Sequence, residues 1–388
     1  MKVGLLTFFQ DDCAGQYYQA LATFNTLREA FPEGHVEIVN LHHSRRWRPW
    51  VGGGLRRFAL SIVKHFKYHQ ARAKNFVISS PELIPETEGV VNHYLAAHGY
   101  DLLVVGSDVC LKIQKDKEGR LPNYWLSSDI GIPHLMLSSS SEFTTCKSIS
   151  EAQRIAAKKS FQQYSFAGVR DTMTVNFLSE LAPDCVQKIC LMPDPTMSLS
   201  VDRDAEVAKL KNLKKKVGKE FCMVNLVDTP LCRELVHLLS KDCYVVEVGP
   251  RVQGSSTCFV PGPDEWNDMF NHFDLVVTTS FHESIFSLKH QTPVVAIDCN
   301  SSRFVSVSGN SKTKYLMHSL GLERCHINPD IQKMTAQQVY DQIIQVRDQF
   351  DWSELGSRFE KMGTQYRATV SAAIERVKAE TINEDSNC

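Results

Sequence analysis

Apolar positions in the first 200 residues form short runs separated by longer stretches of mixed character. Residues 3–9 are mostly apolar, which is typical of a buried strand, and residues 16–31 have the spacing of a helix. Residues 35–41 then alternate between apolar and polar positions. A strand, a helix and a strand in this order predict a parallel α/β sheet. Further strands are expected at residues 100–106, 134–138, 166–170 and 186–192.

The pattern changes after residue 200. Residues 202–219 are polar and rich in lysine, without a strand pattern, so we expect a linker over residues 201–218. A second series of strands is predicted at residues 221–227, 244–248, 275–279 and 294–298. Beyond Thr335 the pattern is helical to about residue 380, with one apolar face made by Trp352, Leu355, Phe359, Met362 and Tyr366.

These patterns predict an α/β fold with two Rossmann-like domains. The first domain is expected over residues 1–200 and the second over residues 219–334, joined by the linker at 201–218. Residues 335–388 are expected to form a helical segment that crosses back to the first domain.

Ligands of open parallel sheets bind beyond the carboxyl ends of the strands. The strand at 275–279 ends on Ser280, and His282 follows in the first turn of the next helix. A helix N-terminus offers free N–H groups and a partial positive charge, which suit a phosphate or a carboxylate. An anion there favours the imidazolium form of His282 and makes it a proton donor. The alternative is a plain N-cap at Ser280 and a solvated histidine.

Two strands of the first domain end on polar residues in the same way. Gly106 lets a ligand approach the backbone, and Asp108 is a candidate to accept a proton from a substrate hydroxyl, to bind sugar hydroxyls or to cap a turn. Arg170 ends another strand with a guanidinium fork that matches a carboxylate or a phosphate. The alternative for Arg170 is an ion pair with Asp171 or with the other domain.

Composition limits the classes of function. The chain has 388 residues, 43% of them hydrophobic and 22% charged, with 43 basic against 44 acidic side chains. This balance excludes a dedicated nucleic-acid binder, and no apolar run is long enough to cross a bilayer. The twelve cysteines are scattered without a C-x-x-C pair. We therefore expect the cysteines to be reduced structural thiols in a cytoplasmic protein. We expect no metal site.

Taken in order, the motifs resemble the polysaccharide pyruvyl transferase family. The similar segments are Gly15-Gln16, 18–22, 104–108, 124–126, 138–141, 169–171, 193–196, 280–282, 286–287, 293–295, Ser311-Lys312, Leu316 and 320–322. The resemblance implies two domains in a GT-B-type arrangement. It also implies transfer of pyruvate from phosphoenolpyruvate onto two hydroxyls of a saccharide, with release of phosphate and without a cofactor.

The resemblance and the chemistry of this reaction together imply roles for individual residues. His282 is expected to protonate the methylene carbon of phosphoenolpyruvate, and Asp108 to act as base or hydroxyl anchor. The carboxylate and phosphate of the donor need fixed cations or N–H groups. Expected donor ligands are Arg170, Ser280, Lys312, Arg303 and Thr229, and expected acceptor ligands are Asp108, Ser107, Gly15 and Gln16.

The chain also departs from the family pattern. Val109 and Cys110 follow Asp108 where family members usually have a glutamine and an aromatic residue, and Glu283 stands where many have glycine. A carboxylate at position 283 suits the helix dipole but is unfavourable beside an anionic donor if it points inward. Lys312 stands where arginine is common, which keeps the charge and loses the bidentate fork.

Two other functions stay open on the sequence alone. A GT-B glycosyltransferase that uses a nucleotide sugar would share the architecture and its helix-terminal phosphate sites. A catalytically inactive saccharide-binding relative is the second alternative, which the departures at Val109-Cys110 and Glu283 leave open. The presence of Arg170, His282 and Lys312 together argues against it.

One further segment has an unusual charge pattern. Residues 45–74 hold nine lysines and arginines and no acidic residue. Apolar side chains are interleaved with them, among them Trp50, Leu55, Phe58, Ile62 and Phe66. The segment is either a basic amphipathic surface for an anionic membrane or a lipid-linked saccharide acceptor, or a core-packing helix with a solvated basic face.

Overall fold

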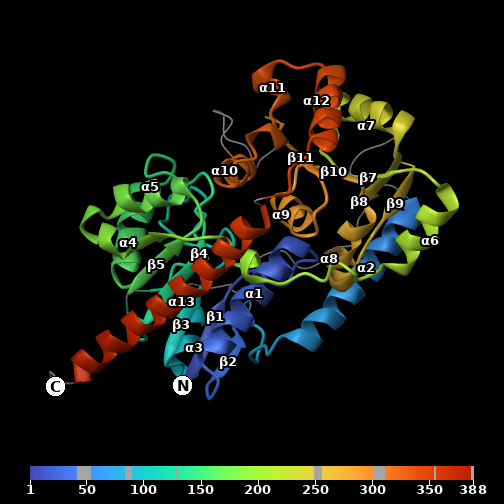
Figure 1. The fold of residues 1–388 in the computed structure, drawn as a ribbon. Coiled ribbons are helices and arrows are strands. Elements are labelled where there is room, and N and C mark those ends of the chain that lie inside the picture. Colours follow the sequence, from blue (N-terminus) through green and yellow to red (C-terminus); the bar gives the residue numbers. More distant parts are fainter. Residues whose placement is uncertain are drawn as a thin grey trace. The chain divides into compact units, whose positions relative to one another are not determined.

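Two units, each built on a parallel sheet with flanking helices, make up the chain (Figure 1). The structure, a computed structural model, describes residues 1–41, 54–83, 90–127, 129–248, 256–299, 311–353 and 355–385. Unit 1 comprises Met1–Arg48, Ala71–Leu199 and Glu360–Cys388. Unit 2 comprises Pro49–Gln70 and Ser200–Phe359. The segment Pro49–Gln70 thus belongs to the second unit, although the sequence placed it in the first domain.

The sheet of unit 1 has six parallel strands in the order β2-β1-β3-β4-β5-β6. The strands are β1 (Lys2–Leu6), β2 (His35–Ile38), β3 (Leu102–Val105), β4 (His134–Ser139), β5 (Phe166–Val169) and β6 (Ile189–Leu191). The helices are α1 (Ala14–Ala30), α3 (Val90–Ala97), α4 (Glu151–Gln162), α5 (Thr172–Leu181) and the 3-10 turns η1 (Pro183–Lys188) and η2 (Pro195–Ser198). Strand β6 is shorter than the expected 186–192 because η1 occupies the residues before it.

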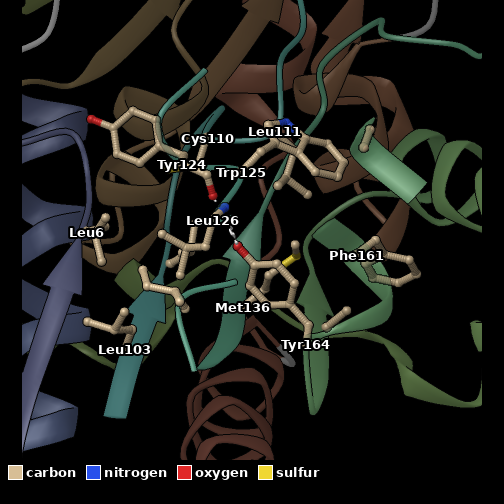
Figure 2. Close-up of a cluster of buried hydrophobic side chains, with 14 of the residues drawn as sticks. Leu6, Leu103, Cys110, Leu111, Tyr124, Trp125, Leu126, Met136, Phe161 and Tyr164 are labelled. Atoms are coloured by element: carbon tan, nitrogen blue, oxygen red, sulfur yellow. Dashed lines mark hydrogen bonds between the residues drawn. The ribbon is translucent and has the colours of Figure 1, made fainter. Parts of the chain in front are cut away.

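The core of unit 1 lies beside β1, β3 and β4 and is closed by the loop after β3 (Figure 2). Tyr164 is fully buried, and its hydroxyl donates to the carbonyl of Tyr124 at 3.1 Å and accepts from the amide of Leu126 at 3.5 Å. Apolar burial and these hydrogen bonds together hold the loop against the sheet. The carboxyl end of β3, where Asp108 follows, is thereby attached to a rigid core.

The sheet of unit 2 also has six parallel strands, in the order β12-β11-β10-β7-β8-β9. The strands are β7 (Phe221–Asn225), β8 (Tyr244–Val248), β9 (Thr257–Phe259), β10 (Leu275–Thr278), β11 (Val294–Ile297) and β12 (His326–Ile327). The helices are α6 (Ala208–Val217), α7 (Pro230–Asp242), α8 (Pro263–Asp268), α9 (Phe281–Lys289), α10 (Lys312–Ser319), α11 (Pro329–Gln332), α12 (Ala336–Asp348) and the 3-10 turns η3 (Met269–His272) and η4 (Glu323–Cys325).

The lysine-rich segment that was expected to be a linker contains helix α6. Leu210 of this helix is buried, and Gly218 ends it in the left-handed conformation with a φ of 65°. Lys214 binds the carboxylate of Asp274 at 2.8 Å, so its charge is paired within unit 2. A polar segment with one buried leucine and a glycine C-cap therefore forms a packed surface helix.

The C-terminal segment consists of two helices with a break between them. Helix α12 packs against α7 in unit 2, and α13 (Leu355–Asp385) begins after residues 349–354. Trp352 therefore precedes the apolar face of α13. Within unit 1, a Cβ added to Gly363 of α13 would lie 2.8 Å from the carbonyl oxygen of Met197, so this helix packs closely on η2. The structure thus returns the last helix to unit 1.

Candidate functional site

In unit 1, one arginine joins the ends of three strands. Arg170 follows β5, and its Nη2 contacts Asp108 Oδ1 at 3.0 Å while its Nη1 contacts Asp194 Oδ2 at 2.9 Å. The side chains of Arg170 and Asp194 are 3% and 2% exposed, and that of Asp108 is 13% exposed. Burial lowers the pKa of Arg170, but the carboxylates of Asp194 and Asp108 outweigh it, and the net shift is upward. The guanidinium is therefore buried and permanently charged, and it holds the carboxylates of Asp108 and Asp194.

These contacts differ from the ion pair with Asp171 that the sequence offered as the alternative for Arg170. The sequence placed its guanidinium on the donor anion or in a pair with Asp171. Instead Asp171 caps α5, accepting from the amide and the hydroxyl of Thr174, each at 2.8 Å. The guanidinium lies between two carboxylates, whose charges already exceed its own. We conclude that its structural task is to hold Asp108 and Asp194.

The turn after β3 fixes the direction of Asp108. Gly106 has a φ of 128°, and a Cβ at this position would lie 2.0 Å from the carbonyl oxygen of Leu137. Asp108 itself has a φ of 78°, and its carbonyl accepts from the amide of Ser140 at 2.8 Å. Only glycine fits at position 106, because any side chain would collide with the neighbouring strand. The glycine of the Gly-Ser-Asp sequence is therefore required by the backbone.

Asp194 is a member of this site to which the sequence assigned no role. Its Oδ2 accepts from Gln19 Nε2 at 2.6 Å, and its Oδ1 accepts from both the amide and the hydroxyl of Thr196. The Pro-Asp-Pro-Thr segment at 193–196 was among the segments similar to the family, but the sequence did not indicate the partner of Asp194. That partner, Arg170, lies 24 residues away in sequence. Such a contact emerges only when β5 and β6 pair.

Three buried polar atoms lie at the same edge of the sheet. Thr7 Oγ1, Gln16 Oε1 and Ser107 Oγ have no hydrogen-bond partner among the described residues. Leu6 pairs with Val105, which sets Thr7 beside the start of the Gly106-Ser107 turn, and Gln16 is in the first turn of α1. Buried polar atoms in proteins nearly always have a partner, so these three suit a polyhydroxylated ligand. Thr7 was missed because it reads as part of an apolar strand.

In unit 2, three helices begin after three adjacent strands. Strands β11, β10 and β7 are neighbours in the sheet and lead to α10, α9 and α7. The side chains of Ser311, Ser280 and Thr229 cap these helices, accepting from the amides of Lys314, Glu283 and Cys232. The N-cap that the sequence offered as the alternative for Ser280 is present, and Thr229 caps α7 in the same way. Three helix N-termini at one sheet edge make that edge attractive to an anion.

His282 and Lys312 lie in the first turns of two of these helices. His282 is the second residue of α9 and is half-buried, with the ring of Phe281 packed edge-on at 5.1 Å. Lys312 is the first residue of α10 and is also half-buried. Arg303, the remaining expected donor ligand, lies outside the described residues.

Glu283 is buried in the sheet edge, with its carboxylate bound by neighbouring strands. Its Oε1 accepts from Asn225 Nδ2 at 2.6 Å, and its Oε2 accepts from the hydroxyl of Thr278. The amide of Ser280 donates to the same hydroxyl at 2.9 Å. The departure at position 283 therefore serves to join the ends of β7 and β10. Asn225 was not singled out in the sequence, although it is a polar residue closing an apolar run.

The end of β11 carries a second buried carboxylate. Asp298 Oδ2 accepts from the hydroxyl of Ser311 and lies 2.6 Å from His326 Nε2. This contact anchors the N-cap of α10, and with it the backbone of Lys312. Among the residues that the structure describes, no group of three or more His, Cys, Asp or Glu side chains is arranged to hold a metal ion. In the same residues no helix is long and apolar enough to cross a membrane.

Comparisons with known proteins agree with this picture of two Rossmann-like units. A sequence model of the family described as polysaccharide pyruvyl transferase matches residues 14–301. No curated protein matches the chain by sequence. Among solved structures, Anabaena HepE in complex with UDP is similar at 12% identity and a TM-score of 0.55, covering 99% of this chain and 100% of its own.

Two further solved structures have the same fold. Medicago truncatula UGT71G1, complexed with UDP-glucose, has 12% identity and a TM-score of 0.55, with 97% of each chain covered. The UDP-GlcNAc 2-epimerase from Methanocaldococcus jannaschii has 10% identity and a TM-score of 0.54, covering 97% of this chain and 100% of its own. At these identities the likeness establishes the α/β fold of the GT-B class.

Proposed function

Because the chain belongs to the polysaccharide pyruvyl transferase family, we propose that it transfers the pyruvyl group of phosphoenolpyruvate onto two hydroxyls of a saccharide. The product is a ketal, and phosphate is released. We place this reaction in the cytoplasm, in the biosynthesis of cell-surface polysaccharides or exopolysaccharides. The acceptor is a free or a lipid-linked saccharide. The protein makes peripheral contact with the inner face of the membrane. The described cysteines are all free thiols, which fits a reducing compartment.

The observation that carries the donor assignment is the set of three helix N-termini with a histidine and a lysine in their first turns. Phosphoenolpyruvate presents a carboxylate and a phosphate on one small skeleton, and free backbone N–H groups bind both kinds of anion. Thr229, Ser280 and Lys312 are the proposed donor ligands in unit 2, and Arg303, which lies between β11 and α10 in the sequence, is the fourth. No cofactor is needed for this chemistry.

His282 is the proposed acid. It gives its proton to the methylene carbon of phosphoenolpyruvate, which becomes a methyl group and leaves an oxocarbenium-like centre at the adjacent carbon. A saccharide hydroxyl attacks that centre, and a base takes its proton. The second hydroxyl then displaces phosphate and closes the ring.

Asp108 is the proposed base or hydroxyl anchor, and Arg170 acts through it. The Arg170 guanidinium holds one carboxylate oxygen of Asp108 at 3.0 Å and fixes the orientation of the carboxyl group. Gln16, Ser107 and Thr7 are proposed acceptor ligands, since their buried polar atoms match saccharide hydroxyls. Gly15, beside Gln16 at the start of α1, is the remaining proposed acceptor ligand.

A second candidate is a glycosyltransferase that uses a nucleotide sugar. The observation in its favour is the shared fold with HepE and UGT71G1, whose structures hold UDP and UDP-glucose. The same helix N-termini would serve a diphosphate.

One assay separates the two candidates. The purified protein is mixed with a panel of glycosides and either phosphoenolpyruvate or UDP-sugars, and released phosphate and released nucleoside diphosphate are measured. Phosphate release that needs both phosphoenolpyruvate and a glycoside, with a pyruvylated product in the mass spectrum, is the expected result. Release of nucleoside diphosphate from a UDP-sugar would instead establish the glycosyltransferase.

A further inference from the structure

Helix α2 (Gly54–Asn75) has an apolar face on which large hydrophobic side chains are exposed. Leu55, Phe58, Ile62 and Phe66 are 88%, 41%, 44% and 60% exposed, and Val63 beside them is 50% exposed. The four recur at intervals of three or four residues, so they share one face of the helix. Single exposed apolar residues are ordinary, but five within about three turns of one helix point to an interaction surface.

The opposite side of α2 is attached to unit 2. Ser61 and Tyr68 are 3% and 1% exposed. Lys67 pairs with Glu265 at 2.5 Å, and a Cβ added to Gly262 would lie 3.0 Å from the Cβ of Lys67. The helix is therefore docked on the N-terminus of α8 through one side, and the orientation of its exposed face is set by this packing.

The charge of the surrounding sequence indicates what this face binds. Residues 45–74 hold nine lysines and arginines and no acidic residue. Arg45, Arg46 and Arg48 lie outside the described residues, whereas Lys64 lies 5.5 Å from the ring of Tyr68 on α2 itself. A segment of this kind is attracted to an anionic surface, and its apolar side chains gain from leaving water there.

We propose that the face formed by Leu55, Phe58, Ile62, Val63 and Phe66 docks on an anionic lipid bilayer. The helix lies in the interface with these five side chains among the lipid headgroups and acyl chains. The basic residues of 45–74 supply the electrostatic attraction, except Lys67 and Arg72, which pair with Glu265 and Asp12. This inference does not depend on the reaction at the sheet edges, and it would bring a lipid-linked acceptor within reach of the protein.

The test is flotation of the full chain with lipid vesicles. Vesicles of phosphatidylcholine alone are compared with vesicles that contain about 30% anionic phosphatidylglycerol, at roughly 50 mM and roughly 500 mM salt. The expected result is binding to the anionic vesicles that is at least about tenfold tighter than to the neutral ones and that weakens at high salt. No flotation with anionic vesicles at low salt would overturn the proposal.

A triple variant, Phe58→Gln with Ile62→Gln and Phe66→Gln, assigns the binding to this face. We expect it to lower vesicle affinity by about tenfold or more, while thermal melting stays as in the wild type because the three side chains are exposed. The matched control is Ile155→Gln on α4, which removes a side chain that is 63% exposed and should leave flotation unchanged. Equal flotation of the triple variant and the wild type would overturn the assignment.

A second copy of the chain is the competing occupant. Sedimentation velocity without lipid distinguishes it, since an apolar interface would give a dimer that the triple variant abolishes. If the chain forms a dimer that persists with anionic vesicles and does not float with them, the partner of this face is a second copy of the chain and not the membrane. Vesicle binding is scored without any substrate, so its outcome is separate from that of the transferase assay.

Discussion

His282 is the residue on which the proposed chemistry most depends. If its imidazole donates the proton to the methylene carbon, His282→Ala should lower turnover by roughly 100- to 10,000-fold, the usual contribution of a positioned general acid. Donor affinity should fall much less, because the N-termini of α7, α9 and α10 still bind the anion. The measurement is phosphate release under saturating donor, together with donor titration by calorimetry.

The matched control for this variant is His318→Ala, which removes an exposed histidine of the same unit that pairs with Glu323. We expect the control to retain wild-type turnover. Full activity of a folded His282→Ala protein would remove the histidine from the mechanism and leave the fold and the family assignment untouched.

Lys312 and Lys314 differ by two positions on α10 and provide a direct test of donor binding. Lys312 is half-buried in the first turn, whereas Lys314 is exposed. Lys312→Ala should weaken donor affinity by roughly 1.5–3 kcal/mol, the value of a charged hydrogen bond, which corresponds to about a ten- to hundredfold rise in Kd. Lys314→Ala should leave it unchanged. Equal donor affinities of the two variants in calorimetry would place the anion elsewhere.

We expect Arg170 to contribute mainly to the free energy of unfolding, because its cation holds two buried carboxylates. Arg170→Ala leaves Asp108 and Asp194 buried without their shared cation, and breaking a buried ion pair from one side costs roughly 3–5 kcal/mol. Arg154→Ala, which breaks an exposed pair with Glu151, should cost no more than about 1 kcal/mol. Urea unfolding of both variants measures the difference. Similar unfolding midpoints would contradict a stabilising role of the buried ion pairs of Arg170.

At this scale the sequence indicates residue types better than it indicates partners. Ser280 and Thr229 are recognisable as N-caps because a cap depends on residues three positions away. Asn225 binding Glu283 and Asp194 binding Arg170 are contacts across 58 and 24 residues. Such contacts depend on which strands become neighbours, and local patterns do not contain that information.

At the scale of secondary-structure elements, long apolar runs are predicted well and short edge strands are not. Strands β7 and β10 were expected within one or two residues of their observed bounds, because they are continuous apolar runs. Strands β9 and β12 have only three and two residues, too few to show a period. Helix α6 was missed because its polar face dominates the segment and Leu210 is the one buried residue of the helix. Only packing against the rest of unit 2, here against η3, distinguishes such a helix from a linker.

The turn that ends β3 provides a test at this same scale. Gly106→Ala places a methyl group 2.0 Å from the carbonyl oxygen of Leu137 at a φ of 128°, so the turn must open or the neighbouring strand must move. We expect loss of soluble folded protein or a fall of several kcal/mol in unfolding free energy. Gly131→Ala is the control, because its φ is 65° and nothing lies within 4 Å of the added carbon.

Melting temperature and near-ultraviolet circular dichroism measure both glycine variants. A cost of about 1–2 kcal/mol is expected for Gly131→Ala, since only the left-handed backbone is penalised. If Gly106→Ala were no less stable than Gly131→Ala, the close approach of β4 to this turn would be contradicted.

Over the whole molecule, buried histidines make folding sensitive to acid. Burial lowers the pKa of His134 in unit 1 and of His272 and His290 in unit 2. For His290 the pKa falls to about 4, with the charges of Arg203 and Lys289 adding to the effect of burial. In the unfolded chain a histidine titrates near 6.5, so below that pH the unfolded state binds more protons than the folded state.

The free energy of unfolding should therefore decrease as the pH falls from about 6.5 toward 4, by at most about 3 kcal/mol from His290 alone. His290→Gln removes this titration and keeps a group able to donate to Asn271 Oδ1, which lies 2.6 Å from the Nδ1 of His290. Urea unfolding at pH 7 and at pH 4.5 tests the effect, because the wild type should lose more stability between the two than the variant does. Other acid-sensitive groups affect both proteins equally, and an identical loss in both would show that His290 is protonated without penalty in the folded state.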